Sequence, residues 1–233
     1  MDIAIISGGK APSKDLLEKY LDKVNYIIAA DSGCECLYEY NIIPDLIVGD
    51  FDSSNEKILE EMKKKVKEII KFPPEKDYTD TEIAIIEGIK RGAKKIYLFA
   101  ATGSRVDHML GNLGLILTYK KKGVEIEVLD DNNRIYLAQN KMTLYGEYGE
   151  NIGFHAFSDV VKNFKIKGAK YNIYDGYDMH LLDPRAICNE FLDTPIEISF
   201  DEGELFNWLK NKEHFNVLLN INIIRWILKS LNI

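Results

Sequence analysis

Short apolar runs alternate with longer amphipathic segments in the first half of the chain. The apolar runs, which we expect to form strands, cover residues 3–6, 26–30, 46–48, 68–72, 96–100 and 124–129. Amphipathic segments with helical spacing cover residues 55–67, 82–91 and 108–121. Continuously apolar strands, each followed by a helix, are typical of a parallel sheet covered on both faces. The pattern predicts a doubly wound α/β domain, with a mostly parallel sheet, over residues 1–132.

The pattern changes after residue 133. Short runs such as "RIYLA", "KMTLY", "IGFHAF" and "IEISF" recur at close spacing, with glycine, asparagine and aspartate between them. This is typical of antiparallel strands, so we expect a β-sandwich-like domain over residues 133–206. Residues 207–233 form a tail in which apolar and polar positions fall at helical spacing over residues 221–232. We expect this tail to form an amphipathic helix that docks on the body or on a second subunit, and membrane contact is the less favoured alternative.

The amino-acid composition narrows the classes of protein to which this chain could belong. The 233 residues are 46% hydrophobic and 29% charged, which indicates a folded globular protein. A formal net charge of -7 disfavours broad nucleic-acid binding, which requires basic residues to replace phosphate counterions. Cys34, Cys36 and Cys188 have no zinc spacing, and their odd number suggests reduced thiols in a cytoplasm. We see neither a targeting peptide at the amino terminus nor a window long enough to span a membrane.

Acidic residues follow three of the predicted strands. The segments are "VGDFDSSNE", "FPPEKDYTDTE" and "FAATGSRVDH", and in each a serine or threonine precedes an acid by three residues, as at a helix start. Any single acid there is best explained as a helix cap. The carboxyl ends of parallel strands, however, share one edge of the sheet. That edge should therefore collect Asp50, Asp52, Asp77, Asp80 and Asp107.

Carboxylates that converge in this way repel one another unless a cation lies between them. Lys76 and Arg105 are too few to balance them, whereas a divalent ion would. Oxygen ligands without an EF-hand loop favour Mg²⁺, which commonly completes its shell with substrate phosphate. The sequence therefore predicts a magnesium site and phosphoryl-type transfer.

Small residues after other strands suit a polyphosphate. Ser7, Gly8 and Gly9 follow the first strand, where backbone N–H groups could approach an anion. Thr102 and Gly103 follow the strand at residues 96–100, and the acid Asp31 follows the second strand, where a helix cap is an equal alternative. Neither a Walker loop nor a G-x-G-x-x-G motif is present.

In order and spacing, "ADSGCECL", "PDLIVGDFDS", "KDYTDTE" and "GSRVDHMLGNL" resemble the thiamine pyrophosphokinase family over roughly residues 1–206. The resemblance implies transfer of pyrophosphate from ATP to thiamine, giving thiamine diphosphate and AMP. It also implies that Asp50, Asp52 and Asp80 hold Mg²⁺, and that Asp31, Arg105 and Asp107 line the nucleotide cleft. A homodimer is implied as well, with thiamine between the α/β domain of one subunit and the β-domain of the other.

Further residues are expected to contact the nucleotide or the substrate. His108 is expected to contact nucleotide, and Lys76, Asp77, Cys188 and Asn189 are expected to contact substrate. The family has serine before the asparagine, where this chain has Cys188, and a thiol is the weaker hydrogen-bond donor. A small buried strand residue is an equal alternative for Cys188. The acceptor of the thiamine hydroxyl proton could be Asp80 or Asp77.

Three rival functions share parts of this pattern. A pterin-alcohol pyrophosphokinase would share the acidic half, but the β-domain with its "CNEF" strand favours thiamine. A non-catalytic thiamine or nucleotide sensor would not need the full set of acids and Arg105. A magnesium-dependent phosphohydrolase would need a nucleophile in a D-x-D-x-T-type setting, which the chain lacks.

Overall fold

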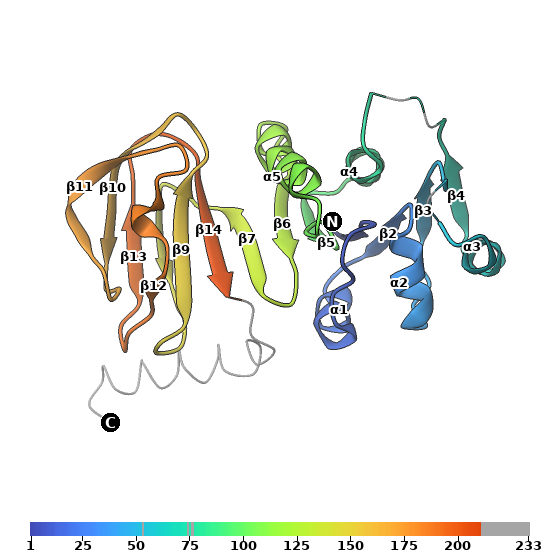
Figure 1. Cartoon of the computed structure of the whole chain (residues 1–233), viewed down its shortest axis with the longest axis horizontal. Coiled ribbons are helices and arrows are strands. Elements are labelled where there is room, and N and C mark those ends of the chain that lie inside the picture. The colour runs from blue at the N-terminus through green and yellow to red at the C-terminus, as the bar shows by residue number, and fades with distance from the viewer. Residues whose placement is uncertain (53, 74, 76, 211–233) are drawn as a thin grey trace. The chain divides into compact units, whose positions relative to one another are not determined.

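The structure, a computed structural model, describes residues 1–52, 54–73, 75 and 77–210 (Figure 1). The chain divides into two compact units, Met1–Asp131 and the residues from Asn132 onward. Each is described by itself below.

The first unit is an α/β domain in which strands and helices alternate along the chain. Its elements are β1 (Asp2–Ile6), α1 (Lys14–Leu21), β2 (Tyr26–Ala30), α2 (Gly33–Glu39), β3 (Leu46–Gly49), α3 (Glu56–Lys63), β4 (Glu68–Lys71), α4 (Asp80–Lys90), β5 (Lys95–Phe99), α5 (Val106–Lys120) and β6 (Glu125–Leu129). The strands lie in the order β6-β5-β1-β2-β3-β4. Every neighbouring pair in this order is parallel, which confirms the predicted fold class.

Helices cover both faces of this sheet, because its strands are apolar on both sides (Figure 1). Ala4 and Ile6 of β1 share one core cluster with residues of α1, α2 and α3. Ile3 points to the opposite face, where its side chain approaches Gly88 of α4. The chain winds from β1 to β4 on one side of β1 and continues with β5 and β6 on the other. The direction of winding therefore reverses between β1 and β5.

The second unit consists of antiparallel strands. Its elements are β7 (Asn133–Leu137), β8 (Lys141–Leu144), β9 (Asn151–Ala156), β10 (Val160–Lys167), β11 (Ile173–His180), a 3-10 turn η1 (Pro184–Ala186), β12 (Asn189–Glu190), β13 (Ile196–Ser199) and β14 (Leu205–Lys210). One layer has the order β12-β9-β14-β7 and the other β11-β10-β13-β8. A core that includes Phe154, Phe164 and Phe191 is buried between them, as expected for a β-sandwich-like domain.

The predicted helical tail begins too early. Residues 207–210 belong to β14, which pairs with both β7 and β9. Leu205 and Leu209 of this strand join the core of the second unit, so sheet pairing decides residues 207–210 and the helix expected there does not form. Residues 211–233, where the rest of the tail prediction falls, lie outside the described residues. Within the described part of the chain, no helix is long and apolar enough to cross a membrane.

Candidate active site

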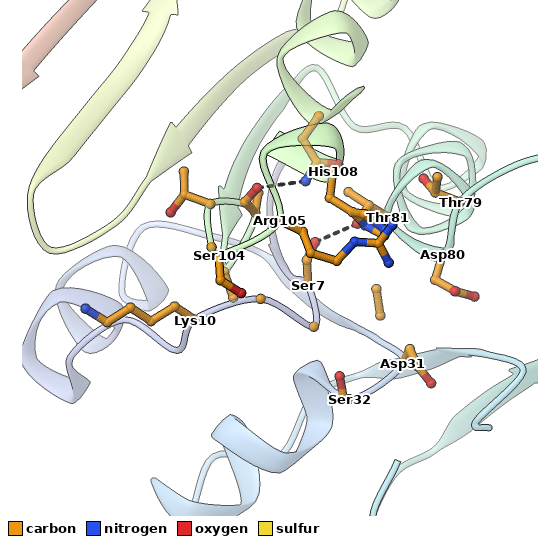
Figure 2. A pocket seen from close by; sticks show the side chains of 18 residues that line it. Ser7, Lys10, Asp31, Ser32, Thr79, Asp80, Thr81, Ser104, Arg105 and His108 are labelled. Atoms are coloured by element: carbon orange, nitrogen blue, oxygen red, sulfur yellow. Dashed lines mark hydrogen bonds between the residues drawn. The ribbon is translucent and has the colours of Figure 1, made fainter. Parts of the chain in front are cut away.

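A cavity of about 610 Å³ opens at the carboxyl edge of the parallel sheet, between the loops that follow β1, β2 and β5. This is the point where the winding reverses, which is the usual ligand site of doubly wound folds. Its lining comprises Ser7, Gly8, Gly9, Lys10, Ala30, Asp31, Ser32, Thr79, Asp80, Thr81, Ala100, Ala101, Thr102, Gly103, Ser104, Arg105, His108 and Asn112. Figure 2 shows Asp31, Asp80 and Arg105 around one part of this hollow, with Lys10 and Ser104 farther along it.

The β1 and β5 loops are held together by main-chain hydrogen bonds. The N–H groups of Ser7, Gly9 and Lys10 donate to the carbonyls of Phe99, Ala100 and Thr102, at 2.9, 2.8 and 3.3 Å. We expected backbone N–H groups of this loop to bind an anion, and for Ser7 and Gly9 that role is wrong because both donors are already used. The small size of these residues instead allows the β1 loop to lie close to the β5 loop.

Side chains of the cavity are also held in place. The Ser7 and Thr81 hydroxyls lie 2.9 Å apart and form a buried hydrogen bond, which ties β1 to the start of α4 (Figure 2). Thr102 donates to Asp130 at 2.7 Å, and the amide of Asn112 donates to the Ala101 carbonyl at 2.8 Å. The cavity wall around the β5 loop is therefore rigidly built before any ligand enters.

Two helices begin at the cavity. Thr79 caps α4 by accepting from the Glu82 N–H at 3.2 Å, which confirms the predicted start. The other two predicted caps are wrong. Asn55, rather than Ser53, caps α3, and Arg105, rather than Ser104, is the N-cap of α5. Ser53 itself lies outside the described residues.

Arg105 makes no capping hydrogen bond with its side chain. Its guanidinium donates to both carboxylate oxygens of Asp107, at 3.2 and 2.6 Å. This pairing lowers the pKa of Asp107 and raises that of Arg105. Asp107 is exposed and pairs with Arg105, but it is not among the residues that line the cavity.

Three carboxylates form a tight acidic cluster beside the cavity. Oxygens of Asp31, Asp50 and Asp52 lie within 4.8 Å of one another. The pKa of Asp52 is raised, chiefly by the charge of Asp50, with smaller contributions from Asp31 and Asp80. The predicted metal set was Asp50, Asp52 and Asp80. The structure instead brings Asp31 into the cluster, while Asp80 lines the cavity nearby.

Other predicted site residues lie apart from the cavity. Asp77 is exposed in the loop before α4 and does not line the cavity, and Lys76 lies outside the described residues. In the second unit Cys188 is exposed with a left-handed backbone (φ 57°), so the buried alternative for it is wrong.

Asn189 is almost fully buried. Its amide donates to the Tyr171 carbonyl at 2.7 Å and accepts from the Tyr171 N–H at 3.0 Å, so this side chain mainly shapes the loop.

The sequence reasoning missed Lys10, Ser32, Thr79, Thr81, Ser104 and Asn112 as lining residues. Their positions in the sequence could have indicated them, because each lies within a few residues of a predicted strand end or helix start. Lys10 is notable because its side chain forms no ion pair with any acid that the structure describes.

Comparison with known proteins decides the family. Residues 17–128 match the profile of the thiamin pyrophosphokinase catalytic domain, and residues 134–205 match that of the vitamin B1 binding domain. A thiamine pyrophosphokinase of Bacillus subtilis (strain 168) is 30% identical over 210 residues, covering 87% of this chain and 95% of that protein. This chain belongs to the thiamin pyrophosphokinase family.

Solved structures of the family agree. The crystal structure of thiamine pyrophosphokinase from Bacillus subtilis has a TM-score of 0.80 at 27% identity, covering 91% of this chain and 100% of that one. That from Geobacillus thermodenitrificans has a TM-score of 0.75 at 27% identity, covering 92% and 99%. Yeast thiamin pyrophosphokinase shares the fold at 16% identity, with a TM-score of 0.76 and coverage of 92% and 88%. Members of the thiamin pyrophosphokinase family are enzymes, and this chain is one of them.

Proposed function

We propose that this enzyme transfers the pyrophosphoryl group of ATP to the hydroxyl of thiamine, giving thiamine diphosphate and AMP. The match to the catalytic and vitamin B1 binding domains, in that order along one chain, is the observation that carries the proposal. The cavity at the point where the winding reverses also supports the proposal. An acidic cluster and cationic side chains suited to a polyphosphate lie together there.

The acidic cluster fits Mg²⁺. Its donors are carboxylate oxygens, which Mg²⁺ prefers, and the repulsion that raises the pKa of Asp52 is what a divalent cation would relieve. We assign Asp31, Asp50 and Asp52 as the residues that hold the ion, with Asp80 close by. When bound, the ion supplies neutralisation of phosphate charge in the transition state.

The cationic side of the cavity would bind the phosphates. Arg105 presents its guanidinium from the start of α5, where unpaired N–H groups of the first helical turn also favour an anion. His108 lies one turn into the same helix, and Lys10 adds a further positive charge. These groups would hold the triphosphate and stabilise the charge that develops on it.

The chemical step is an attack of the thiamine hydroxyl oxygen on the β-phosphorus of ATP. The bond from the β-phosphorus to the oxygen shared with the α-phosphate breaks, and AMP leaves with that oxygen. We assign Asp80 as the acceptor of the hydroxyl proton, because its carboxylate lines the cavity whereas Asp77 does not. Most of the acceleration would then come from positioning and electrostatics.

The second unit would supply the thiamine site. Cys188 is exposed and adjoins Asn189, which fixes the Tyr171 loop, so this region could present a surface to the substrate. As in the family resemblance, we propose a homodimer in which the α/β unit of one subunit and the β unit of its partner enclose thiamine.

Release of AMP from ATP and Mg²⁺ tests the function. The purified chain is assayed with thiamine, with a hydroxymethylpterin and with neither. AMP formed only with thiamine supports the proposal, whereas AMP formed only with the pterin assigns the enzyme to the rival substrate. Ligand binding without AMP in any reaction would instead indicate a sensor.

A further inference from the structure

The loop between β3 and α3 is tied to the turn between β2 and α2 by two hydrogen bonds. The Ser54 hydroxyl donates to an oxygen of Asp31 at 3.1 Å. The backbone N–H of Asn55 donates to Oε1 of Glu35, in α2, at 2.7 Å. Both bonds join segments about twenty residues apart in sequence, so they fix how the two segments lie relative to each other.

The two tied segments carry the three acids of the cluster. Asp31 stands at the end of β2, and Asp50 and Asp52 stand in the β3–α3 loop. The carboxylate oxygens on the two segments lie within 4.8 Å of one another, and like charges at that distance repel, so without ties the loop would tend to move away from Asp31. A metal site needs its oxygens together before the ion arrives, and each tie opposes that movement.

On the side before Asp52, the loop is anchored by Phe51. Phe51 is half-buried against the core cluster of α1, α2 and α3, and its backbone is left-handed, with φ at 67°. Phe51 therefore fixes the position just before Asp52, while Ser54 and Asn55 fix the positions after it. Asp52 is held between two anchored points.

We propose that Glu35 and Ser54 are positioning residues that hold the β3–α3 loop in the geometry that binds the divalent ion. Glu35 acts through the Asn55 N–H and is not itself a ligand, since it is not one of the three clustered acids. The inference rests on the metal site of the proposed function. It extends that site to residues outside the motif "GDFDS" and outside any catalytic contact.

Variants of Glu35 separate the effect of its hydrogen bond from the effect of its charge. Glu35→Ala removes the acceptor of the Asn55 N–H, whereas Glu35→Gln keeps an acceptor oxygen and removes the charge. Glu39→Ala removes a charge from the same helix, and Glu39 accepts no hydrogen bond from the loop that the structure describes. Asp50→Asn serves as the reference for loss of a ligand.

The experiment measures binding of Mn²⁺ alone to the full chain. The paramagnetic resonance signal of the free ion reports how much Mn²⁺ remains unbound. Mn²⁺ is chosen because it shares the oxygen ligands of Mg²⁺. We expect Glu35→Ala to weaken Mn²⁺ binding about fivefold to tenfold, as loss of one ordinary hydrogen bond would. Glu35→Gln and Glu39→Ala should bind within about twofold of the parent chain, since long-range charge is screened by salt. Ser54→Ala should weaken binding and Ser54→Thr should restore it.

Three results would overturn the inference. Equal weakening by Glu35→Gln and Glu35→Ala would show that Glu35 acts by charge alone, and unchanged binding in Glu35→Ala would show that the tie is dispensable. A fall in melting temperature of metal-free Glu35→Ala and Glu35→Gln alike, in step with their binding, would show a general loss of fold. If Asp50→Asn binds Mn²⁺ like the parent, the metal site of the proposed function is itself misplaced, which separates that failure from the others.

Discussion

Three residues in or near the candidate site have unusual backbone conformations. Asp31, Phe51 and Ala100 have φ values of 48°, 67° and 50°, in the left-handed region that side chains other than glycine rarely adopt. Asp31 and Ala100 directly follow β2 and β5, so the chain turns sharply where each strand ends. Such conformations cost about 1 kcal/mol or more each, and they concentrate where a site must be shaped.

The Asp50–Asp52 repulsion predicts a dependence on pH. Because Asp50 raises the pKa of Asp52, the folded metal-free protein holds the Asp52 proton more tightly than the unfolded chain does. The stability from that proton is present below the ordinary aspartate pKa and is lost as the pH rises through the folded-state pKa. Metal-free Asp52→Asn should therefore melt slightly above the parent chain near neutral pH, and the difference should shrink as the pH is lowered.

Thermal melts of the two proteins in EDTA, from acidic to neutral pH, test this expected difference in melting temperature. Turnover of Asp52→Asn should fall at least about a hundredfold. Added salt is the control, since it should reduce the difference in melting temperature. A variant that melts well below the parent at every pH would contradict the repulsion account.

Arg105 and Asp107 should act as a unit. Arg105→Ala should lower kcat by about a hundredfold to a thousandfold, because it removes a donor to the phosphates. Asp107→Asn should cost less, since Asp107 contacts Arg105 and lies off the cavity. The double variant should be no slower than Arg105→Ala alone. Additive losses, measured as kcat and as KM for ATP, would mean that Asp107 has a separate role.

The family resemblance implies a serine at the position that Cys188 occupies in this chain. Cys188→Ser should lower the KM for thiamine about threefold to tenfold, because a hydroxyl is a stronger hydrogen-bond donor than a thiol. The KM for ATP should not change, since the proposed nucleotide site lies in the first unit. Steady-state kinetics with each substrate varied in turn will show this, and an unchanged KM for thiamine would place Cys188 outside the substrate site.

At the scale of elements, the site depends on how closely the ends of β1 and β5 approach. A Cβ on Gly9 would lie 2.3 Å from the Ala100 carbonyl oxygen and 2.8 Å from that of Thr102. Both oxygens accept hydrogen bonds from the β1 loop, at Gly9 and Lys10. The glycine is required by this backbone contact, and the contact sets one wall of the cavity.

Gly9→Ala should therefore destabilise the fold by about 1–3 kcal/mol and sharply reduce activity, because the two loops must separate. Gly111→Ala in α5 is the matched control. Apart from its own helix, no described part of the chain comes within 4 Å of the added Cβ, so this variant should stabilise the protein by about 0.4–1 kcal/mol. Chemical denaturation measures both, and a Gly9→Ala protein as stable and active as the control would show that the loops can yield.

At the scale of the whole molecule, the proposed homodimer leads to a test of where the active site is assembled. Asp52→Asn removes function from the first unit. Cys188→Arg, at an exposed position, places a positive charge where cationic thiamine is expected to bind. If each site combines units from two subunits, co-expression of the two inactive chains creates hybrid dimers with one intact site.

Activity of about a quarter of the parent is then expected from random pairing. Light scattering should show a particle of twice the 26.7 kDa chain mass. An inactive mixture of stable dimers would indicate that each site lies within one subunit.

The sequence by itself determined the fold class of both units and the family, because fold class and family follow from short patterns of neighbouring residues. Apolar runs with helices between them predict a parallel sheet, and the carboxyl ends of such a sheet share one edge, so Asp50, Asp52, Asp80 and Arg105 could be assigned to that edge. The capping pattern at Thr79 was also readable, since it lies within one helical turn.

Only the tertiary structure decided which of these side chains meet. Asp31 joins Asp50 and Asp52, and Glu35 reaches the Asn55 N–H, through spacings that no local pattern contains. The strand at residues 207–210 follows the same rule, since it forms by pairing with β7 and β9 where the start of a helical tail was expected. Contacts between segments distant in sequence depend on strand order and on backbone turns at single residues, and those are fixed only when the chain is packed.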